Sequence, residues 1–302
     1  MKTNKRTFRT VSELNVRPLA LWEKFTNLCE VIANSLSINT TVRNIGIKTL
    51  VLAITLLILS SSAPPPAGNK IDVIVIDPGH GGRDPGTMGK SLKEKDVALK
   101  ISLKLGQYIE KNLPGVKIIY TRKDDRYIDL ADRPMMANTE KADLFICIHA
   151  NAVKGFTAYG TETYVMGMHR SEANMEVAQR ENAVMLLDED YKERYEGFDP
   201  NSPESYILFS LTQSAYQESS LKLAQKIESQ FKSKVGRYSR GVRQAGFWVL
   251  WKTAMPSVLV EVGFLTNPNE EAYLGSAKGQ DEIASGIYRA FKEYKEQIES
   301  LN

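Results

Sequence analysis

Two patterns of apolar residues alternate along the chain from residue 71 onward. Short, largely apolar runs predict strands at residues 72–77, 116–121, 143–149 and 257–262, and residues 161–166 alternate in the manner of a strand. Longer stretches with apolar residues three and four positions apart predict helices at residues 92–111, 130–140 and 281–298. Strands that alternate with helices are typical of an α/β fold, and we expect a twisted mixed β-sheet flanked by helices.

One region interrupts this alternation. Between about residues 167 and 235 the pattern predicts two helical stretches in succession, at 173–191 and 206–235, with no strand between them. The connecting residues 195–203 are rich in Gly, Pro, Asn and Asp, which favour turns. We therefore expect a helical insertion at about residues 167–235 of a catalytic domain that covers residues 70–298.

The N-terminal region has the composition of an export signal. Residues 1–48 carry eight Lys and Arg but only three acidic residues, and the uncharged run 49–59 has the length of a signal-peptide core. It is shorter than the ~20 residues that span a membrane. Residues 1–63 thus predict a basic n-region and signal peptide that ends at the small residue Ala63, or an anchor if the prolines that follow block cleavage. Residues 64–69 form a Pro/Gly linker, and the expected location is the periplasm or cell envelope.

Charge and cysteine content narrow the functional classes. The leader contributes +5 to the net charge of +3, so the remainder carries −2 and has no basic surface of the kind that nucleic-acid binding requires. Cys29 lies in the leader, which leaves Cys147 alone in the body. Its apolar neighbours predict a buried small side chain, and the body has no internal disulfide.

Two histidines and one glutamate predict a metal site. His80 and His149 each follow an apolar strand, and the carboxyl ends of strands are where sites form in open α/β sheets. Glu94 shares a helix face with Val97 and Ile101, where a carboxylate is costly unless it is paired or bound to a metal. Alone, Glu94 would be an ordinary first-turn residue; beside two histidines it favours a His-Glu-His site for one Zn²⁺, with an open fourth position.

A second glutamate predicts acid–base chemistry. Glu261 lies in the middle of the apolar strand "VLVEVGF" and shares a face with Leu259 and Gly263. Burial raises the pKa of an unpaired carboxyl group, which suits general acid–base catalysis. The alternative is a structural glutamate bonded to a backbone amide or an arginine.

Several of these segments resemble a known family. "VIVIDPGHGGRDPG", "YTRKDDRYIDLADRPMMAN", "ADLFICIHAN", "GTETYV" and "MPSVLVEVGFLTNPNE" are similar, in this order, to the zinc-dependent N-acetylmuramoyl-L-alanine amidases. The resemblance covers roughly residues 70–291. It implies cleavage of the amide between N-acetylmuramic acid and L-alanine of peptidoglycan during cell separation, with His80, Glu94 and His149 as zinc ligands and Glu261 as the catalytic glutamate. The glycines beside His80 would then clear space for the metal ligand and for a glycan strand.

Further residues are candidates for substrate contacts. Arg122 and Arg133 could pair with carboxylates of the stem peptide, or could form structural ion pairs instead. Asn151, beside His149, could donate a hydrogen bond to the substrate. Asp77 is expected to be a turn residue or to orient a ligand, and His169 to be solvated.

The expected insertion also has a counterpart in the family. Some of these amidases carry a helix that covers the zinc site until a protein activator displaces it. Here Val177, Glu181 and Val184 are four and then three residues apart, so that Glu181 shares an apolar face and could reach the metal. The alternative is an amphipathic helix with a solvated glutamate.

Two other functional classes remain open. A non-catalytic, zinc-containing cell-wall binding module would keep the fold, but it would not need an acid at Glu261. A nucleotide-binding protein could use the "DPGHGG" turn to hold phosphate, but the chain lacks the P-loop pattern.

Overall fold

The computed structural model describes residues 70–168, 171–207 and 215–300. The expected leader and linker, residues 1–69, lie outside the described residues, and so does His169. None of the helices in the described ranges combines the length and apolar character that a membrane crossing requires.

The centre of the domain is a six-stranded sheet in the order β2-β1-β3-β6-β4-β5. Its strands are β1 (Val73–Pro78), β2 (Lys117–Tyr120), β3 (Leu144–Asn151), β4 (Thr161–Met166), β5 (Ser239–Ala245) and β6 (Ser257–Phe264). All neighbouring strands run parallel except β4 and β6, which pair antiparallel. The sheet is therefore mixed, as the sequence predicts.

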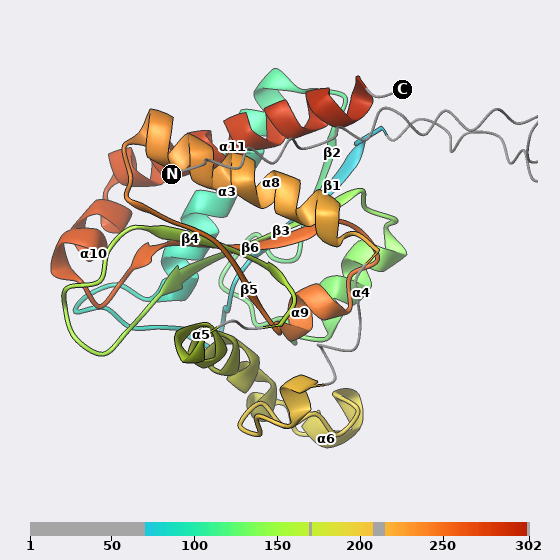
Figure 1. The fold of residues 1–302 in the computed structure, drawn as a ribbon, viewed down its shortest axis with the longest axis vertical. Coiled ribbons are helices and arrows are strands. Elements are labelled where there is room, and N and C mark those ends of the chain that lie inside the picture. Colours follow the sequence, from blue (N-terminus) through green and yellow to red (C-terminus); the bar gives the residue numbers. More distant parts are fainter. Residues whose placement is uncertain (1–69, 169–170, 208–214, 301–302) are drawn as a thin grey trace, which may run out of the picture. The chain divides into compact units, whose positions relative to one another are not determined.

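Helices flank the sheet, and α3, α8 and α11 pack together over one face of it (Figure 1). The helices are α3 (Glu94–Asn112), α4 (Asp132–Thr139), α5 (Glu172–Asn182), α6 (Tyr191–Arg194), α8 (Gln217–Gln230), α9 (Trp248–Trp251), α10 (Pro268–Gly275) and α11 (Ala277–Glu299). A 3₁₀ turn (Ala183–Leu187) follows α5, and a π turn (Phe231–Val235) follows α8.

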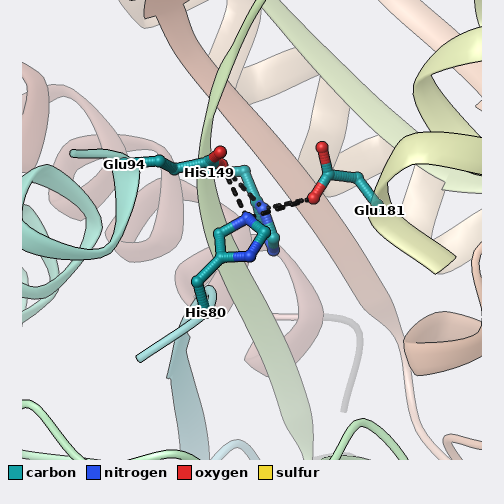
Figure 2. A group of neighbouring side chains, drawn as sticks. All are labelled: His80, Glu94, His149 and Glu181. Carbon is teal, nitrogen blue, oxygen red and sulfur yellow. Dashed lines mark hydrogen bonds and ion pairs between the residues drawn. The ribbon is translucent and has the colours of Figure 1, made fainter. Parts of the chain in front are cut away.

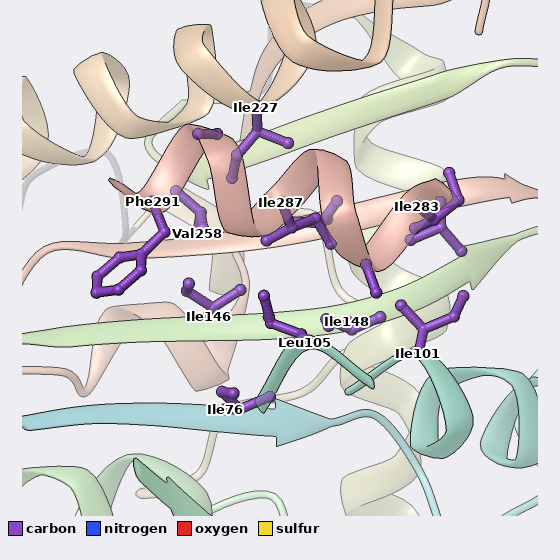
Figure 3. Close-up of a cluster of buried hydrophobic side chains, with 14 of the residues drawn as sticks. Ile76, Ile101, Leu105, Ile146, Ile148, Ile227, Val258, Ile283, Ile287 and Phe291 are labelled. Atoms are coloured by element: carbon purple, nitrogen blue, oxygen red, sulfur yellow. The ribbon is translucent and has the colours of Figure 1, made fainter. Parts of the chain in front are cut away.

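Alternating side chains of each strand build two cores, one on either face of the sheet. On β3, Ile146 and Ile148 face α3 and α11, where they pack with residues such as Leu105 and Ile287 (Figure 3). Phe145 and Cys147 belong to the core on the opposite face, and both are fully buried. Full burial on both faces explains why these strands read as continuous apolar runs rather than as alternating ones.

The second face also carries the polar residues of the site. Asp77, His149 and Glu261 continue the side-chain alternation of the second core at the carboxyl ends of β1, β3 and β6. His149 and Glu261 stand opposite each other in the β3–β6 register. The parallel strand order thus gathers residues that are far apart in the sequence at one edge of the sheet.

The structure corrects the limits of the expected insertion. Helix α8 contributes Leu223, Ala224 and Ile227 to the main core, so it is a flanking helix of the domain and not an added element. The rest of the expected insertion is the segment 171–207, which contains α5 and α6 and lies below the sheet in Figure 1. Its residues Val177 and Met185 join the second core. Strand β5 and helices α9 and α10 were not predicted from the sequence pattern.

Candidate metal centre

Four side chains from four different elements converge at the carboxyl edge of the sheet (Figure 2). They are His80, Glu94, His149 and Glu181, and one ligand atom from each lies within 4.8 Å of all the others. Oε1 of Glu94 is 3.1 Å from Nε2 of His80 and 2.9 Å from Nδ1 of His149. Oε2 of Glu181 is 3.2 Å and 2.9 Å from the same two nitrogens.

These distances fit a tetrahedral metal ion. Zinc ligands at about 2.0–2.1 Å from the ion stand roughly 3.3 Å from one another, close to the separations in this cluster. Within the described residues, Nε2 of His80 and Oε2 of Glu181 are buried without an oriented hydrogen bond. Two nitrogens and two carboxylate oxygens are ligands that zinc accepts, so the residues fit the ion that the sequence predicts.

A strained turn presents His80 to the cluster. His80 has φ of 60°, a left-handed conformation that costs free energy in any residue other than glycine. A Cβ on the preceding Gly79 would lie 2.5 Å from the ring of His149, so only glycine lets the two imidazoles approach. Asp84 accepts a hydrogen bond from Nδ1 of His80 at 2.6 Å, which turns Nε2 toward the cluster.

The glycines that follow have a different role from the one expected. A Cβ on Gly81 would lie 2.2 Å from the carbonyl oxygen of Arg126, and one on Gly82 would lie 2.6 Å from the nitrogen of Tyr127. They allow the turn to pack on a neighbouring loop of the domain; the space that they leave is not a path for a glycan strand.

Two buried arginines hold this turn from beneath. Arg122 donates hydrogen bonds to the carbonyl oxygens of Pro78, Gly79, Lys95 and Asp124. Arg133 bonds to the carbonyl oxygens of Pro78, His80 and Ile128 and forms an ion pair with Asp77 at 2.8 Å. Both arginines are at most 3% exposed. In this structure the guanidinium groups of Arg122 and Arg133 therefore bind the turn itself, Arg122 through carbonyl groups and Arg133 also through the structural ion pair that the sequence left open.

Glu94 is fixed on both carboxylate oxygens. Oε2 accepts a hydrogen bond from the backbone nitrogen of Thr87, and Oε1 accepts one from that of Ala150. Burial would raise the pKa of Glu94, but the positive charge of His80 and the hydrogen bonds from His149 and His80 together outweigh it and lower the pKa to about 2. The carboxylate is therefore ionised, as a metal ligand must be.

Glu261 lies beside the cluster and is fully buried. Neither of its carboxylate oxygens has a hydrogen-bond partner among the described residues; the closest cation is Arg180, 3.7 Å from Oε1. Burial raises the pKa of Glu261 well above its ordinary value, and the negative charge of Glu181 adds to the effect. A structural glutamate would be hydrogen-bonded, so this environment favours a group that exchanges protons.

Two consecutive residues of α5 cover the site. Besides the contacts of Glu181 with both histidines, the guanidinium of Arg180 donates to the carbonyl oxygen of Ala152 and to Oδ1 of Asn151, each at 3.0 Å. Arg180 also pairs with Oε1 of Glu181. Asn151 is 1% exposed beneath this arginine, so in this conformation its side chain contacts α5 and not solvent.

Comparison with known proteins places these motifs in a family. The model of the N-acetylmuramoyl-L-alanine amidase family matches residues 74–293, which include all five residues of the site. The chain belongs to this family. The match extends from β1 into α11, so the family's domain coincides with the described α/β fold.

Curated amidases are about one-third identical to this chain over the aligned region. N-acetylmuramoyl-L-alanine amidase AmiC of Escherichia coli O6:H1 is 35% identical over 74% of this chain and 52% of its own length. AmiA of Escherichia coli K12 is 34% identical over 71% of this chain and 73% of its own length. The chain thus matches only about half the length of the first of these relatives.

Solved structures agree with the fold. The N-acetylmuramoyl-L-alanine amidase of Clostridium difficile 630 is 32% identical, covers 75% of this chain and 97% of its own, and has a TM-score of 0.56. The CwlD amidase of Clostridioides difficile, solved in complex with the GerS lipoprotein, is 26% identical over 74% of this chain and 98% of its own, with a TM-score of 0.55.

Sequence reasoning missed three members of the amidase site. Asp84, which orients His80, stands in a turn where aspartate is common for other reasons. Arg180 adjoins the predicted Glu181, but its contact with Asn151 depends on how α5 docks. Asp188 accepts hydrogen bonds from Arg83, Tyr127 and Tyr195, and no spacing in the sequence indicates these partners.

Proposed function

We propose that the chain is a zinc-dependent amidase that hydrolyses the bond between N-acetylmuramic acid and L-alanine in peptidoglycan. His80, Glu94 and His149 would hold one zinc ion, and Glu261 would be the catalytic glutamate. One observation carries this proposal. Nε2 of His80 and Nδ1 of His149 both lie within 3.1 Å of Oε1 of Glu94, next to the buried Glu261, whose carboxylate has no hydrogen-bond partner among the described residues. A non-catalytic wall-binding module would gain nothing from an unpaired buried acid, which costs stability.

The residues divide the reaction between them. A bound zinc ion would polarise the scissile carbonyl group and lower the pKa of a water molecule. Glu261 accepts the proton of the attacking water and returns it to the nitrogen of L-alanine as the amide bond breaks. Asp84 keeps the His80 ring oriented, and the network of Arg122 and Arg133 keeps the strained turn in place.

We further propose that the segment 171–207 inhibits the enzyme. Glu181 occupies the fourth position of the metal cluster, and Arg180 covers Asn151 and approaches Glu261, so the same helix blocks both halves of the reaction. Because Glu181 is tethered, it competes with water and substrate at a high effective concentration. A protein activator would have to bind the displaced state of the helix more tightly than the covered state.

The proposed place of action is outside the cytoplasm. The basic and then apolar leader supports export to the periplasm or cell envelope, with attachment to the membrane only if the leader is retained. Peptidoglycan, the proposed substrate, lies in that compartment.

Metal analysis of the purified full-length protein tests the assignment of the ligands. We expect one zinc ion per chain, and we expect His80→Ala and His149→Ala to lose it because each removes one of three ligands on the domain. The matched control is Arg126→Ala, an exposed side chain on a nearby loop that pairs only with Asp124 in the described structure. Full zinc content in both histidine variants would show that the ion binds elsewhere.

A further inference from the structure

A cavity of about 340 Å³ extends from the metal cluster along the loop that follows His80. The domain contributes His80, Glu94 and the loop residues Arg83–Thr87 to its wall, and the covering segment contributes Arg180, Glu181, Ala183, Val184 and Leu187. Removal of the segment would therefore open a groove that begins at His80 and Glu94, where the proposed reaction places the scissile bond. Whatever follows that bond in the substrate has room to lie there.

Arg83 is placed at this groove by a rigid turn. It stands between His80 and Asp84, and two backbone hydrogen bonds between Gly81 and Asp84 close the turn around it. Its guanidinium lies 4.2 Å from the centre of the Tyr127 ring, which restricts its orientation. The side chain is nevertheless 51% exposed, unlike the two arginines beneath the turn.

In the covered state, the partner of Arg83 is a carboxylate of the inhibitory segment. Nη2 of Arg83 is 3.0 Å from Oδ1 of Asp188, which also accepts a hydrogen bond from Tyr127 at 2.8 Å. Asp188 is 5% exposed and directly follows the 3₁₀ turn after α5. The segment therefore supplies two carboxylates, Glu181 in contact with the histidines of the cluster and Asp188 in contact with Arg83.

Once the segment has moved, Arg83 loses the carboxylate of Asp188 and can bind another anion. Asp84 and Glu94 are both engaged with histidines, and Arg180 and Glu181 leave with the segment. Arg83 is then the cation that remains among the residues lining the cavity. When Asp188 leaves, the position of its carboxylate beside Arg83 becomes vacant. The guanidinium of Arg83 then lines the same cavity as the proposed metal ligands His80 and Glu94.

We propose that Arg83 binds a carboxylate of the stem peptide, and that Asp188 occupies this subsite in the covered state. This inference rests on the proposed amidase function. The residue that follows L-alanine in peptidoglycan is a D-glutamate linked through its γ-carboxyl group, so its α-carboxyl group is either free or amidated. Arg83 selects the free acid, because a guanidinium binds a carboxylate more strongly than a neutral amide.

The test compares two synthetic substrates, N-acetylmuramoyl-L-alanyl-D-isoglutamate and its D-isoglutamine counterpart. We expect the full-length zinc enzyme to show a kcat/KM at least about tenfold higher for the acid, the usual scale for one charge-assisted hydrogen bond. Arg83→Ala should bring the ratio close to one, because it removes recognition of the acid, whatever it does to the rates on both substrates through release of the segment. Arg83→Lys should keep part of the preference, and the control Arg126→Ala should keep all of it.

The ratio of kcat/KM for the acid to kcat/KM for the amide separates substrate recognition from release of the segment. Any change in the fraction of uncovered enzyme multiplies both rates equally, so it cancels in the ratio. Equal rates of the parent on both substrates, or an unchanged ratio in Arg83→Ala, would overturn the proposal. An increase of both rates by the same factor in Arg83→Ala would mean that Arg83 only fastens the segment, which also contradicts it.

A binding measurement keeps this result distinct from the amidase function itself. In a Glu261→Gln background, calorimetric titration with the two compounds should give at least about tenfold tighter binding of the acid, and Arg83→Ala should abolish the difference. Absence of hydrolysis by the parent zinc enzyme, together with this binding preference, would contradict the proposed reaction and leave the Arg83 subsite standing. Equal binding of both compounds would contradict the subsite.

Discussion

Glu261 is the residue on which the proposed chemistry depends most. The change Glu261→Gln conserves volume and removes the proton acceptor, so the fold and the zinc content should remain while hydrolysis falls by about a hundredfold or more. A muropeptide hydrolysis assay with metal analysis of the same sample checks both parts. Near-normal turnover would mean that Glu261 is structural.

Individual residues differed in how well the sequence predicted them. Glu94 and Glu261 were found because each is an acid on an otherwise apolar helix face or strand, which makes its presence costly. His80 and His149 were found because both follow apolar strands, whose carboxyl ends are where sites form in α/β sheets. The sequence left two interpretations of Arg122 and Arg133 open, because most of their partners are backbone carbonyl groups of a turn. A main-chain carbonyl gives no signal in the sequence, so only the structure shows that these cations are already satisfied.

At the level of elements, α5 is the one whose role can be tested alone. Glu181→Ala removes the carboxylate from the metal cluster and should raise the basal release of dye from labelled peptidoglycan, since the fourth position becomes accessible. Deletion of about residues 171–191 should raise it several-fold, more than the point change. Basal rates equal to the parent's in both folded variants would contradict inhibition by this helix.

The deletion needs a check of its own. Val177, Ala178 and Met185 are buried in the second core, so their loss costs stability as well as inhibition. Circular dichroism should confirm that the variant is folded before its rate is compared. A matched control is Glu176→Ala, which changes an exposed glutamate of the same helix and should leave the basal rate unchanged.

Helices and strands were predicted correctly where the apolar residues follow one clear pattern, and were missed where they do not. Central strands β1, β3 and β6 are buried on both faces, and their apolar runs were recognised. Edge strand β5, with the sequence SRGVRQA, has mostly half-buried residues and too few apolar positions to indicate a strand. Helix α8 was assigned to an insertion because its amphipathic pattern does not say which surface it packs against.

For the whole molecule, the two cores should make folding independent of the metal. Both cores are built from the sheet and its helices, and the cluster lies at one edge, so a chelator should lower the melting temperature without unfolding the domain. A free zinc concentration a thousand times the dissociation constant adds about 4 kcal/mol to the free energy of unfolding. For a domain of this size, this raises the melting temperature by roughly 10 °C. Calorimetry with and without chelator measures this. Complete unfolding on chelation would contradict it.

The central claim is that this chain cleaves the amide bond between N-acetylmuramic acid and L-alanine. Its most direct test is to digest purified peptidoglycan with the zinc-loaded Glu181→Ala protein and to identify the newly formed amino termini. We expect new N-terminal L-alanine in step with solubilisation of the wall, and none with a Glu181→Ala, Glu261→Gln double variant. New reducing sugar ends, or new amino termini from any other stem residue, would contradict it.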